Sequence, residues 1–443
     1  MPIPRDAVDR LLLSIESERL ALVCGAGLSM GSTSNVPSAK QLAEMCWDKY
    51  QVITGNSLPA TLRSNLENLV QYFLDERLYE PIFIGSLVPW SLFRKEYHLG
   101  HVAVADLLAI GALQFAISTN YDSLVEDAVS SLGERDYGAA LEPHENPYGG
   151  SRPYKSLHKI HGCCVKDRTH TVWTKRQIID DATIHTRIEL YRRWLPPNIT
   201  NKDLLITGFW TDWDYLIDIL LDSLTSVHPI SIFLVNPSTE LELSTKAPRL
   251  WEWATDHEVW FKHIQMSAAD FLDEFRCIFS SHMFSQVIQS STEDFERVNG
   301  RRYSGPTSLN PTLSSESLYS MRRNLHGVPA NEIIRDRKTC EAHRRFGIAH
   351  MRLVEEGAHL NAGIYELRGE RIRLIHAAGQ VMSAVREKFQ HERLPMNYAD
   401  KTICAGALED AAAVSVVRPS SLSSIVRSGS SALWLSDLAY FHY

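Results

Sequence analysis

The sequence has no stretch of about 18 consecutive apolar residues, the length that a membrane-spanning helix needs. Its first ten residues, MPIPRDAVDR, are too charged for a secretory signal peptide. Hydrophobic residues make up 44% and charged residues 22% of the 443 residues, which excludes wholesale disorder, collagen and coiled coil. We therefore expect a globular, cytoplasmic protein without a membrane segment.

Cysteines at metal-binding spacing are also lacking, because the chain contains no Cys-x-x-Cys pair. The seven cysteines, an odd number in a long chain, fit a reducing compartment better than a disulfide framework. His158, His161, Cys163 and Cys164 lie close together in sequence, but adjacent cysteines do not chelate one tetrahedral ion comfortably. We expect no bound metal, and His161 is either a general base or a structural histidine.

Basic residues are outnumbered, with 45 Lys and Arg against 53 Asp and Glu and a formal charge of -8. An acidic balance of this kind argues against a dedicated nucleic-acid binder. We therefore expect no direct nucleic-acid binding.

The fold class follows from short apolar runs that each end in a polar or glycine-containing turn. These runs are Leu20 to Cys24, Phe115 to Ser118, Leu204 to Thr207 and Ile230 to Val235. Segments with helical spacing separate them. The alternation predicts an α/β protein with a doubly wound, Rossmann-like parallel sheet, in which ligands bind at the carboxyl ends of the strands.

The α/β alternation weakens after about residue 285, and residues 304–320 are rich in Ser, Pro, Thr and Gly. We expect a first domain over 1–285, a linker or long loop over 286–320, and a mixed α/β extension over 321–443. In this extension the pattern predicts helices at 339–356 and 374–390, and strands at 364–367 and 413–417.

The first candidate site is the loop Gly25-Ala26-Gly27-Leu28-Ser29, which follows the first apolar run. Glycines there let the backbone approach a phosphate group, although a tight turn explains them equally well. The next glycine, Gly31, comes one residue late for a dinucleotide fingerprint, and no Gly-Lys-Ser/Thr follows, which counts against a P-loop.

The second candidate site is Ser118-Thr119-Asn120-Tyr121-Asp122, placed where a strand ends and a helix begins. Asn120 could bind a ribose or a water molecule. Asp122 is equally suited to cap the helix that follows.

Taken in order, the GAGLS loop, Thr119/Asn120/Asp122, and His161-Gly162 resemble the sirtuin-like NAD-binding family. The glycine-led turn Gly208-Phe209-Trp210-Thr211-Asp212-Trp213-Asp214 is similar to a fourth landmark of that family. The segment ISTNYDSLVEDA, followed later by KIHG, especially resembles the branch of this family found in bacterial antiphage defence. The resemblance covers about residues 15–275.

The chain departs from the deacetylating sirtuins, which carry a four-cysteine zinc module that is missing here. The resemblance therefore implies an NAD+ glycohydrolase, an NADase that cleaves the nicotinamide–ribose bond, with NAD as substrate and no metal. It assigns the catalytic roles to Asn120 and His161. It assigns substrate binding to Gly25, Ala26, Gly27, Ser29, Thr119, Asp122, Gly208 and Asn236.

An unrestrained NADase would deplete the NAD of its own cell. The resemblance therefore implies an effector of abortive infection that is gated by homo-oligomer assembly or by a partner. Argonaute-like proteins, HerA-like ATPases and phage-derived activators are the partner classes it suggests, and 321–443 is the expected oligomerisation or partner-binding region. Two alternatives remain: a module that senses NAD or ADP-ribose without turnover, and an NAD-dependent protein deacylase.

Overall fold

The computed structural model describes residues 2–131, 137–145, 155–211, 228–256, 259–308, 313–325, 337–390, 399–408 and 433–441. The chain divides into two compact units. Unit 1 comprises residues 1–130 and 134–273, and unit 2 comprises 131–133 and 274–443.

Unit 1 is built around a six-stranded sheet with the order β3-β2-β1-β4-β5-β6. Every neighbouring pair in it is parallel. The strands are β1 (Leu20–Cys24), β2 (Ala116–Ser118), β3 (Leu157–Lys159), β4 (Asp203–Thr207), β5 (Ser231–Val235) and β6 (Trp260–Ile264). Their registers place the last residues of all six strands in one row, so their carboxyl ends meet at one edge of the sheet.

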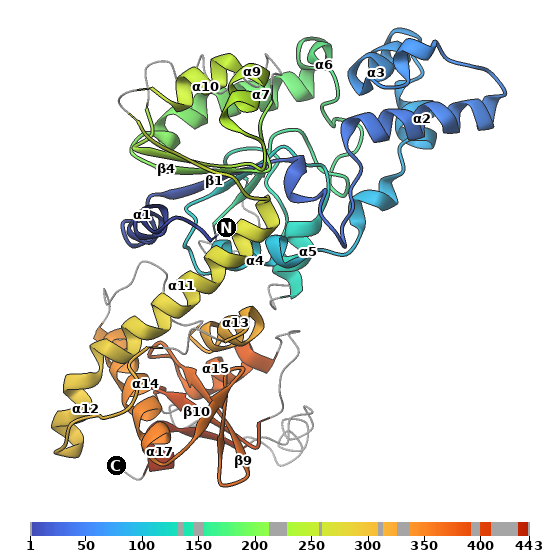
Figure 1. Cartoon of the computed structure of the whole chain (residues 1–443). Helices are drawn as coiled ribbons and strands as arrows, with labels where there is room; N and C mark the ends of the chain where they lie inside the picture. Colours follow the sequence, from blue (N-terminus) through green and yellow to red (C-terminus); the bar gives the residue numbers. More distant parts are fainter. Residues whose placement is uncertain are drawn as a thin grey trace, which may run out of the picture. The chain divides into compact units, whose positions relative to one another are not determined.

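Helices cover both faces of this sheet, because its strands are apolar on both sides. Figure 1 shows α7, α9 and α10 on one side of the sheet and α1 and α4 on the other. The α-helices of unit 1 are α1 (Arg5–Glu16), α2 (Ala39–Thr54), α3 (Leu66–Asp75), α4 (Leu99–Ala109), α5 (Leu124–Ser131), α6 (Lys175–Asp180), α7 (Ala182–Ile199), α9 (Glu240–Lys246) and α10 (Pro248–Ala254). Helix α2 begins with a capping box between Ser38 and Gln41.

Two buried clusters hold unit 1 together. In the first, one stripe of α7 that includes Ile184, Ile188 and Tyr191 packs on alternate residues of the central strands. The second lies among α2, α3 and the π-helix η3 (Tyr79–Leu87), and Phe73 and Trp173 are fully buried in it. Short 3-10 turns join these parts: η1 (Ala26–Leu28), η2 (Ala60–Leu62) and η4 (Trp90–Arg94).

Unit 2 contains a five-stranded mixed sheet with the order β11-β10-β9-β8-β7. β9, β10 and β11 are parallel, whereas β7, β8 and β9 pair antiparallel. Its strands are β7 (His359–Asn361), β8 (Ile364–Leu367), β9 (Glu370–His376), β10 (Lys401–Ala405) and β11 (Leu433–Ser436). Helix α11 (Ala268–Ser290) begins in the last residues of unit 1 and continues into unit 2. The later helices are α12 (Thr292–Asn299), α13 (Ser315–Arg323), α14 (Arg337–Glu355), α15 (Met382–Gln390) and α17 (Asp437–Phe441).

The doubly wound parallel sheet and the mixed C-terminal extension that the sequence predicts are both present. The helix predicted at 374–390 is wrong in its first part, because β9 runs to His376 and α15 begins only at Met382. Helix α12 and part of α13 lie inside 286–320, where the composition predicts a linker or long loop. The predicted strand at 413–417 lies outside the described residues. In the described part of the chain, no helix is both long enough and apolar enough to span a membrane.

Candidate active site

A cavity of about 340 Å³ opens at the carboxyl ends of the unit 1 strands. The order of the strands along the chain reverses between β1 and β4, and in open α/β sheets a ligand crevice forms at such a point. The cavity is lined by Ala26, Ser29, Val36, Pro37, Ala39, Leu42, Leu66, Phe93, Thr119, Asn120, Tyr121, Asp122, His161, Gly208, Phe209, Trp210 and Thr211.

Three glycines let the loops after β1 and β4 touch. A Cβ on Gly208 would lie 2.4 Å from the backbone nitrogen of Leu28, and Gly208 has a φ of +61°. A Cβ on Gly25 or Gly27 would lie within 2.9 Å of Gly208 backbone atoms. The N–H of Gly27 donates to the carbonyl of Gly208 (2.9 Å), and that of Gly25 donates to the carbonyl of Thr207 (3.3 Å). The absence of side chains at these three positions therefore lets the two loops pack together.

Ser29, at the end of this loop, holds Asn120. The Asn120 side chain donates through Nδ2 to Ser29 Oγ at 3.1 Å. His101 Nε2 lies 3.0 Å from the same oxygen. Because His101 Nδ1 accepts from the backbone N–H of His98 (3.3 Å), the hydrogen of His101 is on Nε2, which donates to Ser29. The carboxamide of Asn120 is thereby fixed, with Nδ2 as the donor toward Ser29.

His101 stays neutral because burial lowers its pKa to about 2. Burial raises the pKa of Asp122, while the nearby Lys159 charge and a hydrogen bond from Ser29 oppose the rise. The Asp122 carboxylate also accepts from the N–H of Leu124 at 3.3 Å, which is the helix-capping contact that its position predicts.

His161 lies on the loop after β3, and its side chain is buried. Its Nδ1 donates to the backbone carbonyl of Thr119 at 3.1 Å, which places the lone pair of the neutral ring on Nε2. Burial lowers the pKa of His161 to about 3, well below the range near neutrality in which an unperturbed histidine titrates. His161 is therefore a neutral imidazole in the physiological range, and its Nε2 is a hydrogen-bond acceptor.

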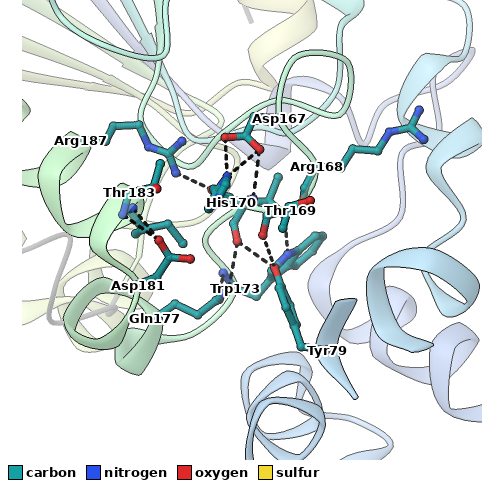
Figure 2. Close-up of polar contacts among 12 residues, drawn as sticks. Tyr79, Asp167, Arg168, Thr169, His170, Trp173, Gln177, Asp181, Thr183 and Arg187 are labelled. Atoms are coloured by element: carbon teal, nitrogen blue, oxygen red, sulfur yellow. Dashed lines mark hydrogen bonds and ion pairs between the residues drawn. The ribbon is translucent and has the colours of Figure 1, made fainter. Parts of the chain in front are cut away.

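The segment that follows His161-Gly162 is held by hydrogen bonds, which Figure 2 shows. The Asp167 carboxylate accepts from the backbone N–H (3.2 Å) and from Nδ1 (2.9 Å) of His170. The hydroxyl of Tyr79 donates to the Thr169 carbonyl at 3.1 Å, and Arg187 donates to the His170 carbonyl at 2.6 Å.

Among the described residues, no group of three or more His, Cys, Asp or Glu side chains could hold a metal ion.

Further along the same segment, Val172 and Trp173 pack on two residues that line the cavity, His161 and Tyr121. The N–H of Val172 donates to the His161 carbonyl at 2.8 Å, and Tyr121 donates to the Val172 carbonyl at 2.5 Å. The ring centroids of Tyr121 and Trp173 lie 4.3 Å apart. The His161 loop and the Asn120 loop are thus braced by one packed layer.

Residues 114–255, about a third of the chain, match the family model of the SIR2-like domain. The chain carries a SIR2-like domain. The matched part includes Thr119, Asn120, Asp122 and His161, whereas the GAGLS loop precedes it. No curated protein matches the chain in sequence.

Solved structures similar to this chain include a Sir2 homologue in complex with NAD, with 17% sequence identity and a TM-score of 0.33, over 60% of this chain and 91% of that one. A Sir2 homologue mutant in complex with ADP-ribose has 15% identity and a TM-score of 0.34, over 60% and 94% of the two chains. A Sir2 homologue mutant with 2′-O-acetyl ADP-ribose has 14% identity and a TM-score of 0.31, over 62% and 95%.

Most site residues predicted from the sequence meet in the cavity of unit 1. These are Ala26, Ser29, Thr119, Asn120, Asp122, His161 and Gly208. Gly25 and Gly27 lie beside it and pack on Gly208. Asn236 is not among the lining residues; its Oδ1 accepts from the N–H of Ser238 at 3.0 Å. Of the predicted glycine-led turn, Asp212 to Asp214 lie outside the described residues.

Sequence reasoning missed two histidines at the start of α4 that support the site, His98 and His101. His98 caps the helix by accepting from the N–H of Gly100, and His101 reaches Ser29. The sequence signal that could have found them is the composition of α4. This helix is otherwise apolar, yet polar residues, His101 and Asp106, occupy buried positions in it. Ser29 and His101 are 72 residues apart, so local patterns do not reveal their contact.

Proposed function

We propose that this chain is an NAD+ hydrolase that binds NAD in the cavity of unit 1 and cleaves its nicotinamide–ribose bond. The observation that carries the proposal is the meeting of Asn120 and His161 at one cavity, at the switch point of the sheet. The cavity volume of about 340 Å³ falls in the usual range for small-molecule sites. The match of 114–255 to the SIR2-like domain and the sirtuin structures bound to NAD and ADP-ribose agree with this choice of ligand.

The bond to be cleaved needs little help at the leaving group, because the nicotinamide ring nitrogen is already cationic. Cleavage passes through an oxocarbenium-like state at the ribose, as in glycoside hydrolysis. The protein must therefore orient the ribose, stabilise positive charge and deliver water.

The chain's own residues supply these functions in the proposal. Asn120 presents Oδ1 to a ribose hydroxyl or to the attacking water, since its Nδ2 donates to Ser29. His161 accepts a proton from that hydroxyl or water at Nε2, because its Nδ1 donates to Thr119. The loop after β1 and Gly208 contact the phosphates in the proposal, since Ala26, Ser29 and Gly208 line the cavity.

We further propose that this activity serves as a gated effector in bacterial antiphage defence, acting by NAD depletion in the cytoplasm. Unit 2 has its own mixed sheet and is the candidate for homo-oligomer assembly or for contact with an activating partner. Argonaute-like, HerA-like ATPase and phage-derived partners are the classes to try first. Size-exclusion with light scattering tests the gate: a strictly monomeric chain with constant activity would contradict it.

The test of the hydrolase is the release of nicotinamide from NAD by the purified full chain over a range of protein concentrations. We expect wild-type protein to release nicotinamide, and Asn120→Ala and His161→Ala to reduce the rate by at least about 100-fold while retaining the wild-type unfolding midpoint. Wild-type rates in either variant would refute the site assignment.

Two other outcomes of that assay identify the alternatives. Binding of NAD or ADP-ribose without nicotinamide release would identify a sensing module. Release that depends on an added acyl-lysine peptide would identify a deacylase.

A further inference from the structure

A buried ion pair lies beneath the candidate active site and belongs to neither the cavity lining nor the proposed chemistry. Lys159 Nζ lies 2.6 Å from Glu126 Oε1, and the two side chains are only 2% and 10% exposed. Lys159 Nζ also donates to the backbone carbonyl of Asp122. One ammonium group therefore contacts the loop after β2 and the helix that follows it.

The positions of these contacts tie the two proposed catalytic residues together. Lys159 is the last residue of β3 and stands two residues before His161. Asp122 stands two residues after Asn120, and Glu126 belongs to α5, which begins at Leu124. Lys159 thus joins the His161 strand to the far end of the Asn120 loop.

The near end of that loop is fixed by other contacts. The N–H of Thr119 donates to the Cys24 carbonyl at 3.1 Å, and the N–H of Asn120 donates to Ser118 Oγ at 3.1 Å. His161 in turn takes its ring orientation from the Thr119 carbonyl. Because the near end is fixed, a shift of the far end, at Asp122, is taken up between the two ends and changes the position of Asn120 relative to His161.

Stability alone does not account for the pair. Two charges lose their hydration on burial, and apolar residues of similar volume are often as stabilising or more so. Burial by itself would lower the pKa of Lys159, but the neighbouring charges, Glu126 first, outweigh it and raise that pKa, so Lys159 stays protonated. The ammonium supplies something that an apolar side chain cannot, which is a donor to the Asp122 carbonyl.

We propose that Lys159 is a positioning residue for the hydrolysis reaction, with Glu126 as its counter-ion. It holds the loop from Thr119 to Asp122 at the spacing from His161 that the reaction needs. This inference rests on the proposed function, and the experiments below distinguish a failure of the inference from a failure of that function.

The test replaces the pair with apolar residues of similar size, Lys159→Met together with Glu126→Leu, so that neither partner of the ion pair is left buried without the other. A misplacement on the order of 1 Å at a reacting group lowers the rate by about 100-fold. We expect kcat to fall at least about tenfold, KM for NAD to stay within about twofold, and the unfolding midpoint to stay within about 5 °C of wild type. A double variant with wild-type kcat would overturn the proposal.

The control replaces a second ion pair, which joins the residue before β1 to the first residue of β4. Arg19 Nε lies 3.0 Å from Asp203 Oδ2 at the amino ends of β1 and β4, away from the cavity. Arg19→Met with Asp203→Leu is expected to alter the unfolding midpoint and to keep kcat within about twofold. If this control loses kcat as strongly as the Lys159 variant, general loosening of the sheet explains both and the positioning role fails.

A spectroscopic measurement decides the case where the wild type has no turnover and the proposed function itself fails. Histidine-labelled full chain is examined by long-range proton–nitrogen correlation, with the His161 ring signals assigned by their loss in His161→Gln. We expect the wild type to show the neutral ring with the hydrogen on Nδ1, and the Lys159→Met, Glu126→Leu variant to show shifted His161 ring signals with the unit 2 histidines His343, His350 and His376 unmoved. Unchanged His161 signals would overturn the positioning role without reference to activity.

Discussion

Replacing Gly208 by alanine perturbs the site without touching the proposed catalytic groups. The new Cβ would lie 2.4 Å from the Leu28 nitrogen, whereas ordinary contacts begin at 3.4 Å. The loop after β1 would therefore have to move by about 1.0 Å, the difference between these two distances. The left-handed φ of +61° adds about 1–2 kcal/mol of backbone strain for any residue with a Cβ.

The movement reaches the chemistry through Ser29, which follows Leu28 and accepts from Asn120 Nδ2. A displacement of this size corresponds to an activity loss of about 100-fold. The assay is nicotinamide release, with the folded state checked by chemical denaturation. We expect Gly208→Ala to lose about 100-fold in kcat/KM and about 2 kcal/mol or more in the free energy of unfolding.

Gly55→Ala is the matched control, because Gly55 has a φ of +71° and a Cβ added there would meet no atom within 4 Å. Gly55→Ala therefore introduces the backbone strain without a steric clash, and it should lose about 1 kcal/mol in the free energy of unfolding with unchanged activity. Gly25→Ala, whose Cβ would lie 2.9 Å from the Gly208 carbonyl, should fall between the two and remain folded. Full activity in Gly208→Ala, or equal losses in Gly208→Ala and Gly55→Ala, would refute the reasoning.

Two further predictions concern the cysteines and the buried histidines. Cys163→Ser with Cys164→Ser should keep nicotinamide release within about twofold, and chelators should not change it; a collapse on chelator treatment would indicate a metal. Burial lowers the pKa of His343 to about 4 and of His350 and His376 to about 3. These histidines are neutral when folded and charge on unfolding, so the stability of unit 2 is complete above about pH 6.5 and falls as the pH decreases. Each contributes about 1.4 kcal/mol per pH unit, about 4 kcal/mol together between pH 6 and 5; denaturation midpoints that do not change over this range would contradict it.

In unit 1, the strands that the sequence predicts are those whose residues are mostly apolar. β1, β2, β4 and β5 are buried along their whole length. β3 was missed because it contains His158 and Lys159, which are buried only because tertiary partners satisfy them. β6 was missed because it is an edge strand and four of its five residues are only partly buried.

The candidate site was predictable to the extent that its residues stand at strand ends. Asn120 and His161 follow β2 and β3, and parallel strands bring such residues to one edge of a sheet. Their supports were not predictable, because the Lys159–Glu126 and Ser29–His101 contacts join segments far apart in the sequence. The sequence signal for the ion pair was Lys159 itself. It stands in the run LHKIHG, which otherwise contains only apolar residues and histidines, so a buried partner for its charge was to be expected.

The most direct test of the central claim is a mass balance on NAD incubated with the purified full chain. The account predicts that nicotinamide and an ADP-ribose product appear in equal amounts as NAD is lost, and that His161→Ala abolishes the loss. Stoichiometric binding of NAD with no nicotinamide released, with and without candidate partners, would contradict it.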